Sequence, residues 1–549
     1  MHIAIRIVAA ATIAVSGQPP NTVEQTTPGP REPAAIVEQF DGLGEGFAGP
    51  QGTASLRNPS DNSLAVGPDH IVQTVNSRMA VFTKRGTRFD ETGRVLYGPV
   101  NTNNVFRGFG GACDARNNGD AVVRYDQLAD RWLIVMPVFT RAPARPDQPS
   151  VWTARASAYN SPAGRPEQPG SAVVLHQPPA APVAPSAPLA PLAPSEGPFS
   201  MCYAVSVGPD PLGAYYRYEF LRPLFPDYPR PAVWPDGYYV PTSTGDEVIE
   251  KHACVVEREA MLAGRSAREL CFVINDVNFL NNADLDGTTL PPPGAPNVMM
   301  AAGGSQLNGV LADDQILAWR FFTDWNDTSK TRLDGPTRIG VAPYTYLCGG
   351  QLTSCVPQPG VDRRLDAQGD KLMARLVYRR INNQQSIVAA HSVDTTAGGG
   401  GVRWYEFRID GTGTPSLYQQ GTYAPAAPEA PLAPLAPLAP WFRWMPSPAM
   451  DKFGNIGIGY SFGGAPFFAG QRFAGRLAAD PPGMLGLREA VLVEGEASQT
   501  TTLRWQDYTQ TAVDPSDDCT IWYVGDYFKA RATSYSSRIG AFRFPGCTP

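Results

Sequence analysis

The chain repeats one pattern of apolar and polar positions. An apolar or aromatic run enters a polar turn that often holds Asp, and a second such run leaves it, as in NSLAVGPDHIVQTV (62–75). Apolar runs separated by Gly, Asp and Asn turns are typical of β-hairpins. We predict hairpins at seven places: 62–75, 120–137, 231–243, 296–321, 372–393, 448–461 and 511–525.

The spacing of these hairpins predicts the architecture. They start about 58 to 77 residues apart, except for one interval of roughly 110 that contains the Pro-rich stretch 141–198. One hairpin plus one further strand pair per repeat is the pattern of a β-propeller blade. The sequence therefore predicts an all-β fold, most simply a seven-bladed β-propeller, with six or eight blades as the open alternatives.

Composition supports this prediction and excludes some partners. The 54 Gly and 55 Pro among 549 residues disfavour long helices, since both residue types are costly inside a helix. The formal net charge is -6 and no basic run offsets it, which argues against a nucleic-acid partner. After the N-terminus no stretch reaches 18 apolar residues, so we expect no membrane span.

The N-terminus has the features of a secretory signal, because Arg6 precedes a short apolar run that ends in small residues at 14–16. We therefore expect a secreted or periplasmic protein. The predicted organisation is a signal peptide at 1–16, a partly disordered leader at 17–54, and one propeller domain at 55–549 with Pro-rich insertions at 141–198 and 424–440.

Eight cysteines are present, and their even number fits an oxidising compartment. None forms a CxxC pair, which disfavours a zinc ribbon or a thioredoxin-type site. Many pairings are open, and the simplest joins neighbours along the chain: Cys113–Cys202, Cys254–Cys271, Cys348–Cys355 and Cys519–Cys547.

Carboxylates precede the first strand of several repeats, and these residues are Asp61, Asp120, Asp227, Asp370 and Asp507. In a propeller the first strands line the central channel, so the loops that enter them ring one channel mouth. Five acids at one rim would hold a divalent cation, bind a cationic ligand, or supply a general acid and base. The alternative is that each Asp only caps a turn by accepting bonds from backbone N–H groups.

The segment NNADLDG (281–287) suggests a second acidic site. Asn282, Asp284 and Asp286 followed by Gly287 match the first half of a calcium loop, although Pro293 stands where the loop needs its final Glu. Ca²⁺ is the one cofactor that the sequence suggests, and an ordinary Asx-rich turn is the alternative.

The stretch TAVDPSDDCTIWYVGDYF (511–528) holds four aspartates. Compared with the sister repeats, Asp514, Asp517 and Asp518 fall at the junction between strand and turn. We therefore expect them to build a hairpin turn, with Cys519 beyond it able to reach Cys547.

Several long blocks resemble a family of secreted bacterial β-propeller proteins of uncharacterised function. They include FPDYPRPAVWPDGYYV (225–240), APYTYLCGGQLTSC (342–355), GVRWYEFRIDG (401–411), AMDKFGNIGIGYS (449–461) and VDPSDDCTIWYVGDYF (513–528). The resemblance covers most of residues 55–549 outside the Pro-rich tracts. It implies a secreted propeller and brings no catalytic assignment.

Two functions remain open. The first is a secreted binding or scaffold protein that recognises a glycan, a surface polymer or another protein through one propeller face. It leads because the sequence shows no nucleophile, no triad and no strong metal motif, and because propellers often serve as rigid interaction platforms. Trp441 and Trp444 would stack on sugars if exposed, and core packing or clamping of the Pro-rich tract is the alternative. The alternative is a polysaccharide-active hydrolase or lyase with carboxylates at the channel mouth.

Overall fold

The fold is all-β, as the sequence pattern predicted. The computed structural model describes residues 23–54, 56, 58–140, 198–243, 250–275, 277–303, 314–350, 353–426 and 440–547. Its helices are short, namely α1 (Gly111–Ala115), α2 (Arg258–Leu262) and the 3-10 turns Thr102–Phe106, Thr328–Lys330 and Leu347–Gly349. None of these described helices is long and apolar enough to cross a membrane. The predicted signal peptide and almost all of both Pro-rich insertions lie outside the described residues.

The described strands form seven four-stranded antiparallel meanders. The first three are β5 (Ser63–Val66), β6 (His70–Val75), β7 (Arg78–Thr83) and β8 (Val95–Asn101); β9 (Val122–Asp126), β10 (Arg131–Pro137), β11 (Phe199–Ser206) and β12 (Tyr215–Arg222); and β13 (Ala232–Trp234), β14 (Gly237–Tyr239), β15 (Glu250–Val256) and β16 (Glu269–Asn275).

The other four meanders follow in chain order. They are β17 (Asn281–Leu285), β18 (Asn297–Gly303), β19 (Gln315–Phe322) and β20 (Arg332–Gly340); β23 (Leu376–Ile381), β24 (Gln384–Asp394), β25 (Gly400–Ile409) and β26 (Pro415–Tyr423); β27 (Phe442–Met450), β28 (Ile456–Gly464), β29 (Phe467–Arg476) and β30 (Leu487–Val493); and β31 (Gln510–Val513), β32 (Ile521–Tyr527), β33 (Ser536–Arg543) and β2 (Ala35–Asp41).

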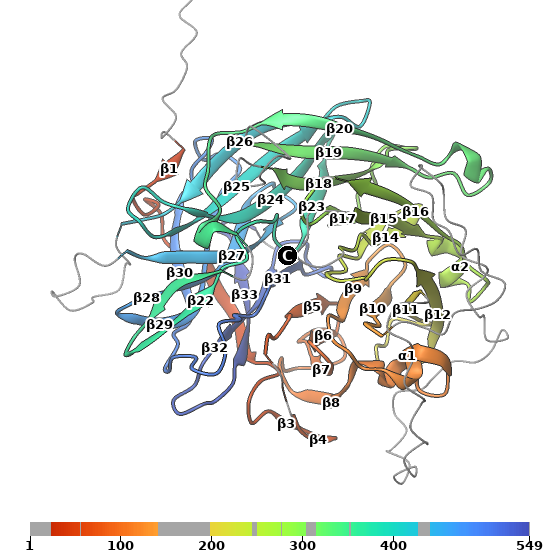
Figure 1. The fold of residues 1–549 in the computed structure, drawn as a ribbon, viewed down its shortest axis with the longest axis horizontal. Coiled ribbons are helices and arrows are strands. Elements are labelled where there is room, and N and C mark those ends of the chain that lie inside the picture. The colour runs from red at the N-terminus through yellow and green to blue at the C-terminus, as the bar shows by residue number, and fades with distance from the viewer. Residues whose placement is uncertain are drawn as a thin grey trace, which may run out of the picture.

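The first strands of the meanders lie together. Each contacts the first strand of the next meander, from β5 through β9, β13, β17, β23, β27 and β31, and β31 contacts β5 again. Figure 1 shows the meanders spread around a common centre, near which these first strands lie. β17 and β23 also pair in parallel, which joins two meanders and the short strand β1 (Glu24–Gln25) into one nine-stranded sheet.

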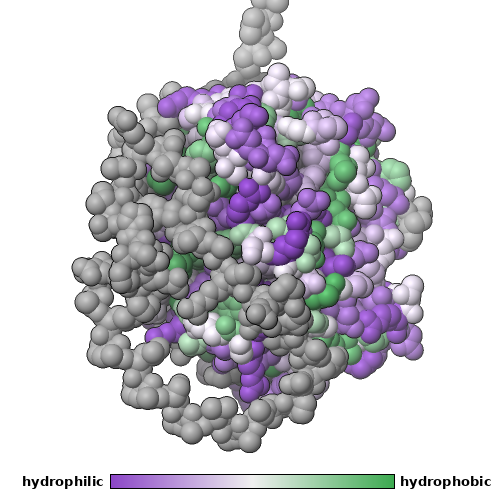
Figure 2. Space-filling view, turned by 90° about the vertical axis from the view of Figure 1, so that its right-hand side faces the viewer, coloured by the Kyte–Doolittle hydropathy of each residue, from purple (hydrophilic) through white to green (hydrophobic). Residues whose placement is uncertain are grey.

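Apolar contacts hold neighbouring meanders together on both of their faces. In β5, Ala65 packs in a cluster with Trp132 of β10, whereas Leu64 and Val66 pack with Trp522 of β32. Successive side chains of a strand point to opposite faces, so a strand buried on both sides must be apolar at nearly every position. This explains the uninterrupted apolar runs of the sequence. On the outer face shown in Figure 2, hydrophilic residues are interspersed with hydrophobic ones.

One predicted hairpin has a different place in its meander. The stretch 296–321 contains β18 and β19, the second and third strands, and the first strand is β17. The polar residues of β17 are typical of a turn in the sequence. In the structure, however, their side chains form hydrogen bonds to neighbouring meanders. The Asn281 amide donates to Met373 O at 2.8 Å, and the Asn282 amide donates to Tyr239 O at 2.9 Å.

The leader supplies the outer strand of the last meander. β2 pairs with β33 in antiparallel fashion, so the two ends of the described chain share one sheet. Before it, β1 pairs with β26 and Arg31 bridges to Leu487 at the start of β30. The part of the predicted leader that the structure describes, from Val23 onward, therefore lies against three successive meanders.

All four sequential disulfides are present: Cys113–Cys202, Cys254–Cys271, Cys348–Cys355 and Cys519–Cys547. Disulfides persist in oxidising compartments, so four of them fit a location outside the cell. The turn prediction for 511–528 is also confirmed. Asp517 accepts from the Cys519 and Thr520 N–H groups at 2.9 Å, Asp514 accepts from Ser516 N–H at 2.9 Å, and Asp518 has a left-handed φ of 56°.

We predict that removing β2 destabilises the whole protein, because β33 would become an unpaired edge and its apolar contacts would be exposed. A chain that begins at Glu45 should show a thermal midpoint lower by about 5 °C or more. The control is a chain that begins at Ala34, which keeps β2 and removes β1. Equal thermal midpoints for the two chains in a calorimetric scan would contradict this prediction.

Candidate functional site

The five carboxylates predicted to converge lie in the loops that enter the first strands, which we call the entry end. Asp61 precedes β5, Asp120 precedes β9, Asp227 precedes β13, Asp370 precedes β23 and Asp507 precedes β31. Asp61 is hydrogen-bonded to Asp120 and interacts electrostatically with Asp227 and Asp507. The Asp370 carboxylate lies 3.7 Å from Lys371 Nζ, and Lys371 in turn interacts with Asp227. The entry end therefore gathers acids from five meanders.

Three of these carboxyls form a chain in which Asp120 stands between Asp61 and Asp227. An ionised carboxylate only accepts hydrogen bonds, so two bonded carboxyls must hold at least one proton between them. Burial, followed by repulsion from Asp507, raises the pKa of Asp61 to about 8. Burial, followed by the charge of the neighbouring carboxyl, raises the pKa of Asp120 and Asp227 to about 7 each. The chain therefore shares protons near neutral pH.

A second group of carboxylates at the entry end is paired with cations. Arg504 Nε lies 2.9 Å from Asp507 Oδ1, and its Nη2 bonds the other oxygen, so the pair is bidentate. The same guanidinium lies 3.9 Å from Asp366. Asp370 accepts from the Asn278 amide at 2.7 Å. Protonated and charge-paired carboxyls thus lie side by side.

Asp366, at the end of the hairpin β21 (Ser354–Gln358) and β22 (Val361–Asp366), was missed by the sequence analysis. It is completely buried, and burial together with Asp507 raises its pKa to about 7. No repeat spacing points to Asp366, because its hairpin is inserted between two meanders. Arg504 could have been identified from the sequence, because it stands three residues before the predicted site residue Asp507 and carries the opposite charge.

The same hairpin shields the entry end. Val356 and Leu365 pack in one apolar cluster with Tyr228, Phe279 and Tyr508, which come from the entry loops. Asp61 and Asp370 at this end are only 1% and 5% exposed. Removing water is also what raises the carboxyl pKa values.

Several buried polar atoms at the entry end lack a hydrogen-bond partner among the described residues. They are Asp61 Oδ1, Asp370 Oδ1, Asn278 Oδ1, and the hydroxyls of Tyr228, Tyr508 and Tyr535. A buried polar atom without a partner is costly, so such a group of atoms indicates a place where water or a ligand binds.

The backbone of the entry loops is left-handed at four of these positions. Asp61, Asp120 and Asp507 have φ values of 46°, 52° and 58°, and Tyr228 has 51°. A non-glycine residue in this region costs on the order of 1 kcal/mol. Such strain persists only where surrounding structure holds it, and here it aims the side chains at one point.

The calcium prediction concerns residues of β17. Asn282 donates its amide to a backbone carbonyl, as described above. The Asp284 and Asp286 carboxylates are ion-paired with Arg375, at 2.9 Å from Nε and 2.6 Å from Nη2. Arg124 lies 3.2 Å from Asp284 as well. An ion here would have to displace a guanidinium, and calcium binding by this segment stays a prediction.

A small cavity lies beside this ion-pair network. Arg124, Asp284, Asp286 and Arg375 line it together with residues of β5 and β31, and its volume is about 30 Å³. A space of this size holds a water molecule or two and no sugar. The entry end is therefore the better candidate for a functional site.

Of the two tryptophans after the second Pro-rich tract, Trp444 cannot stack on a sugar, and Trp441 is partly exposed. Trp444 is completely buried, and Trp441 stacks on Phe462 and contacts Phe467.

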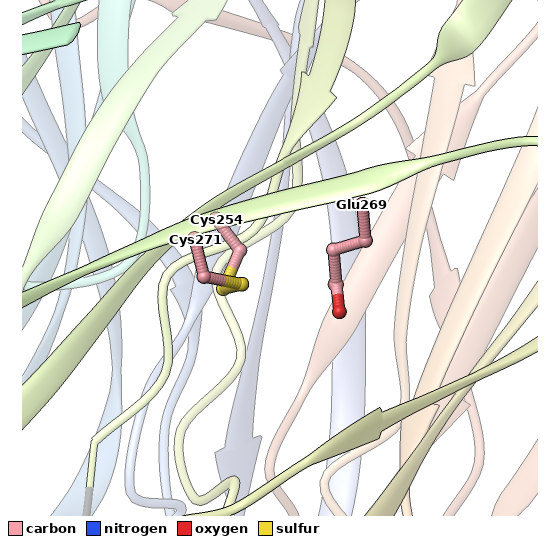
Figure 3. Close-up of side chains that lie close together, drawn as sticks. All are labelled: Cys254, Glu269 and Cys271. Atoms are coloured by element: carbon pink, nitrogen blue, oxygen red, sulfur yellow. A yellow bond between two sulfur atoms is a disulfide. The ribbon is translucent and has the colours of Figure 1, made fainter. Parts of the chain in front are cut away.

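Within the described residues, one group of metal-ligand side chains lies close together, namely Cys254, Glu269 and Cys271. Figure 3 shows the two sulfur atoms joined in a disulfide with Glu269 beside them. Disulfide sulfur is not a thiolate, so this group is no metal site. Glu269 is instead paired with Arg222 at 2.6 Å.

No protein-family model and no curated protein matches the sequence. Solved structures match weakly. AofleA from Arthrobotrys oligospora is 10% identical, with a TM-score of 0.30, over 63% of this chain and 78% of that chain. A protein of unknown function from Dyadobacter fermentans is 10% identical, with a TM-score of 0.33, over 93% and 99%. An α-L-arabinofuranosidase from Lactobacillus brevis is 10% identical, with a TM-score of 0.27, over 58% and 91%.

The raised pKa values predict a stability that falls with rising pH. A carboxyl with a folded pKa of about 7 or 8 binds its proton more tightly than the unfolded chain, where the value is near 3.8. The folded state therefore loses stability as pH rises from about 4 to about 8, by about 1 kcal/mol or more for each carboxyl.

Asp61→Asn removes one of these titrating carboxyls, so the free energy of unfolding should fall less steeply with pH than in wild type. The measurement is urea unfolding between pH 4 and pH 8. The control is Asp90→Asn in an exposed turn, which should follow the wild type. Parallel curves for Asp61→Asn and wild type would contradict the prediction.

Proposed function

We propose that the seven meanders are the blades of a seven-bladed β-propeller and that the entry end is one mouth of its channel. The cycle of contacts among the first strands supports this, as does the completion of the last meander by β2. We also propose secretion, which the predicted N-terminal signal and the four disulfides support.

We propose further that the protein is a hydrolase that cleaves a polysaccharide with carboxyl groups at this mouth. The observation that carries the proposal is the chain of three carboxyls, buried and proton-sharing, beside carboxylates that are paired with Arg504 and Lys371. Two carboxyl groups in different protonation states are the usual equipment for cleaving a glycosidic bond.

The roles follow from the environments. Asp61 keeps its proton at neutral pH and donates it to the glycosidic oxygen as the bond from that oxygen to the anomeric carbon breaks. A water molecule adds to the anomeric carbon and loses its proton to ionised Asp227, the end of the chain that is not bonded to Asp61. The Asp507 carboxylate, which pairs with Arg504, lies nearby and stabilises positive charge that develops on the sugar ring.

Two outcomes would support other functions. Glycan binding without cleavage would favour the secreted binding or scaffold protein that the sequence analysis placed first. Loss of activity with a chelator would favour a cation such as Ca²⁺ at the carboxylates. The proposed reaction needs only proton transfer from a carboxyl to the substrate and from water to a carboxylate, so a chelator should leave it unchanged.

We predict that Asp61→Asn and Asp120→Asn lower the turnover number by about 100-fold or more, because each removes a proton donor or acceptor from the chain. The measurement is the release of reducing ends from a panel of polysaccharides, with and without chelator.

Asp334→Asn, a half-exposed carboxylate on β20, serves as the matched control and should retain activity. Circular dichroism should show the same fold for all variants. Full turnover by either active-site variant would remove the carboxyl chain from the mechanism, and no turnover of any polymer by wild type would refute the hydrolase.

A further inference from the structure

Arg230 is a buried cation at the entry end. It stands between Asp227 and β13, and only 1% of it is exposed. The ring of Tyr228 lies over the guanidinium with its centre 3.6 Å from Cζ, and the ring of Tyr508 lies 3.7 Å away. The two ring centres are 5.7 Å apart and their planes stand at 83° to each other, so the rings flank the guanidinium on two adjacent sides. We call Arg230 and these two rings the slot.

The edge of this guanidinium is unsatisfied. Among the described residues, Nε, Nη1 and Nη2 of Arg230 find no acceptor in hydrogen-bond geometry. Other buried arginines pair with carboxylates: Arg222 with Glu269, Arg258 with Asp126, and Arg443 with Glu489, at 2.6 to 2.7 Å. Arg230 has no carboxylate partner of this kind, and the Tyr508 hydroxyl is the neutral polar group that interacts with it. A buried cation without a carboxylate is costly, so its free N–H groups favour an acceptor from outside the chain.

The slot adjoins the carboxyl chain. Tyr228 directly follows Asp227, Tyr508 directly follows Asp507, and Arg230 interacts electrostatically with Asp120. A group held at the edge of Arg230 thus lies next to the residues that we assign to bond cleavage. Asp120 shares protons with its two neighbours, so it does not neutralise Arg230 completely.

We propose that Arg230 binds the carboxylate of an acidic sugar, and that the substrate is a polysaccharide that contains uronic acids. This rests on the proposed function and names its substrate class. A guanidinium presents a planar fork of N–H groups that a carboxylate matches with two parallel bonds.

The test compares binding of acidic polymers with their neutral forms. Polygalacturonate, alginate and hyaluronan would each be paired with the same polymer after reduction of its carboxyl groups to alcohols. Calorimetry should show that wild type binds at least one acidic form about tenfold more tightly than its reduced form. Arg230→Gln should lose this preference. Equal affinity of wild type for both forms of every pair, or a preference that survives in Arg230→Gln, would overturn the proposal.

Controls separate the alternatives. Arg230→Lys keeps the charge and loses the fork, so it should bind with a reduced preference, and it carries the test if the Gln variant does not fold. Arg332→Gln removes an arginine of β20 whose Cζ lies 3.8 Å from the centre of the Phe322 ring on β19. This variant should behave as wild type. Acetate that competes as well as monomeric galacturonate would assign the slot to any free carboxylate and overturn the sugar assignment.

The readout is binding, so it is independent of cleavage. Asp61→Asn should retain the preference for the acidic polymer while it loses turnover. If wild type prefers the acidic form but cleaves nothing, the hydrolase fails and the uronate site stands. If wild type cleaves reduced polymers as well as acidic ones, the hydrolase stands and the uronate site fails.

Discussion

Every meander of this protein is apolar on both of its faces, and that constraint shapes the rest of the molecule. A sheet of this kind is stable only with a neighbour on each side, as Leu64 and Ala65 of one strand illustrate by packing toward opposite neighbours. When seven such sheets follow one another along the chain, the first and the last each have one apolar face that is covered only if they pack together. The contact between β31 and β5, and the pairing of β2 with β33, meet that need.

The same arrangement creates the candidate site. Because all first strands lie around one centre, the loops that enter them deliver side chains to one place from positions that are hundreds of residues apart. Asp61, Asp120 and Asp227 would be ordinary turn residues in an isolated hairpin. At the entry end they are buried together, and the shared cost of burying charge leaves protons on them near neutral pH.

Arginine has opposite uses in the two parts of the centre. Arg375 and Arg124 neutralise Asp284 and Asp286, which closes that region to all but a small cavity. Arg230, at the entry end, is flanked by two tyrosine rings and has no carboxylate paired with it in hydrogen-bond geometry among the described residues. The first is an ion-pair network that holds neighbouring meanders together, and the second is a cation prepared for a partner from outside.

Local pattern was enough to predict the hairpins, the turn built by Asp514, Asp517 and Asp518, and the four sequential disulfides. These features depend on residues that are near one another in the chain or on strands that follow one another. Repeat spacing also predicted that five aspartates would meet, since equivalent loops converge in a repeated architecture. Only the tertiary structure decided that β17 is a strand, because its Asn side chains find their partners on other meanders. It alone placed β2 on the last sheet, Asp366 among the acids, and Arg230 against two tyrosines. Desolvation and long-range pairing set these features, and neither leaves a periodic signal in the sequence.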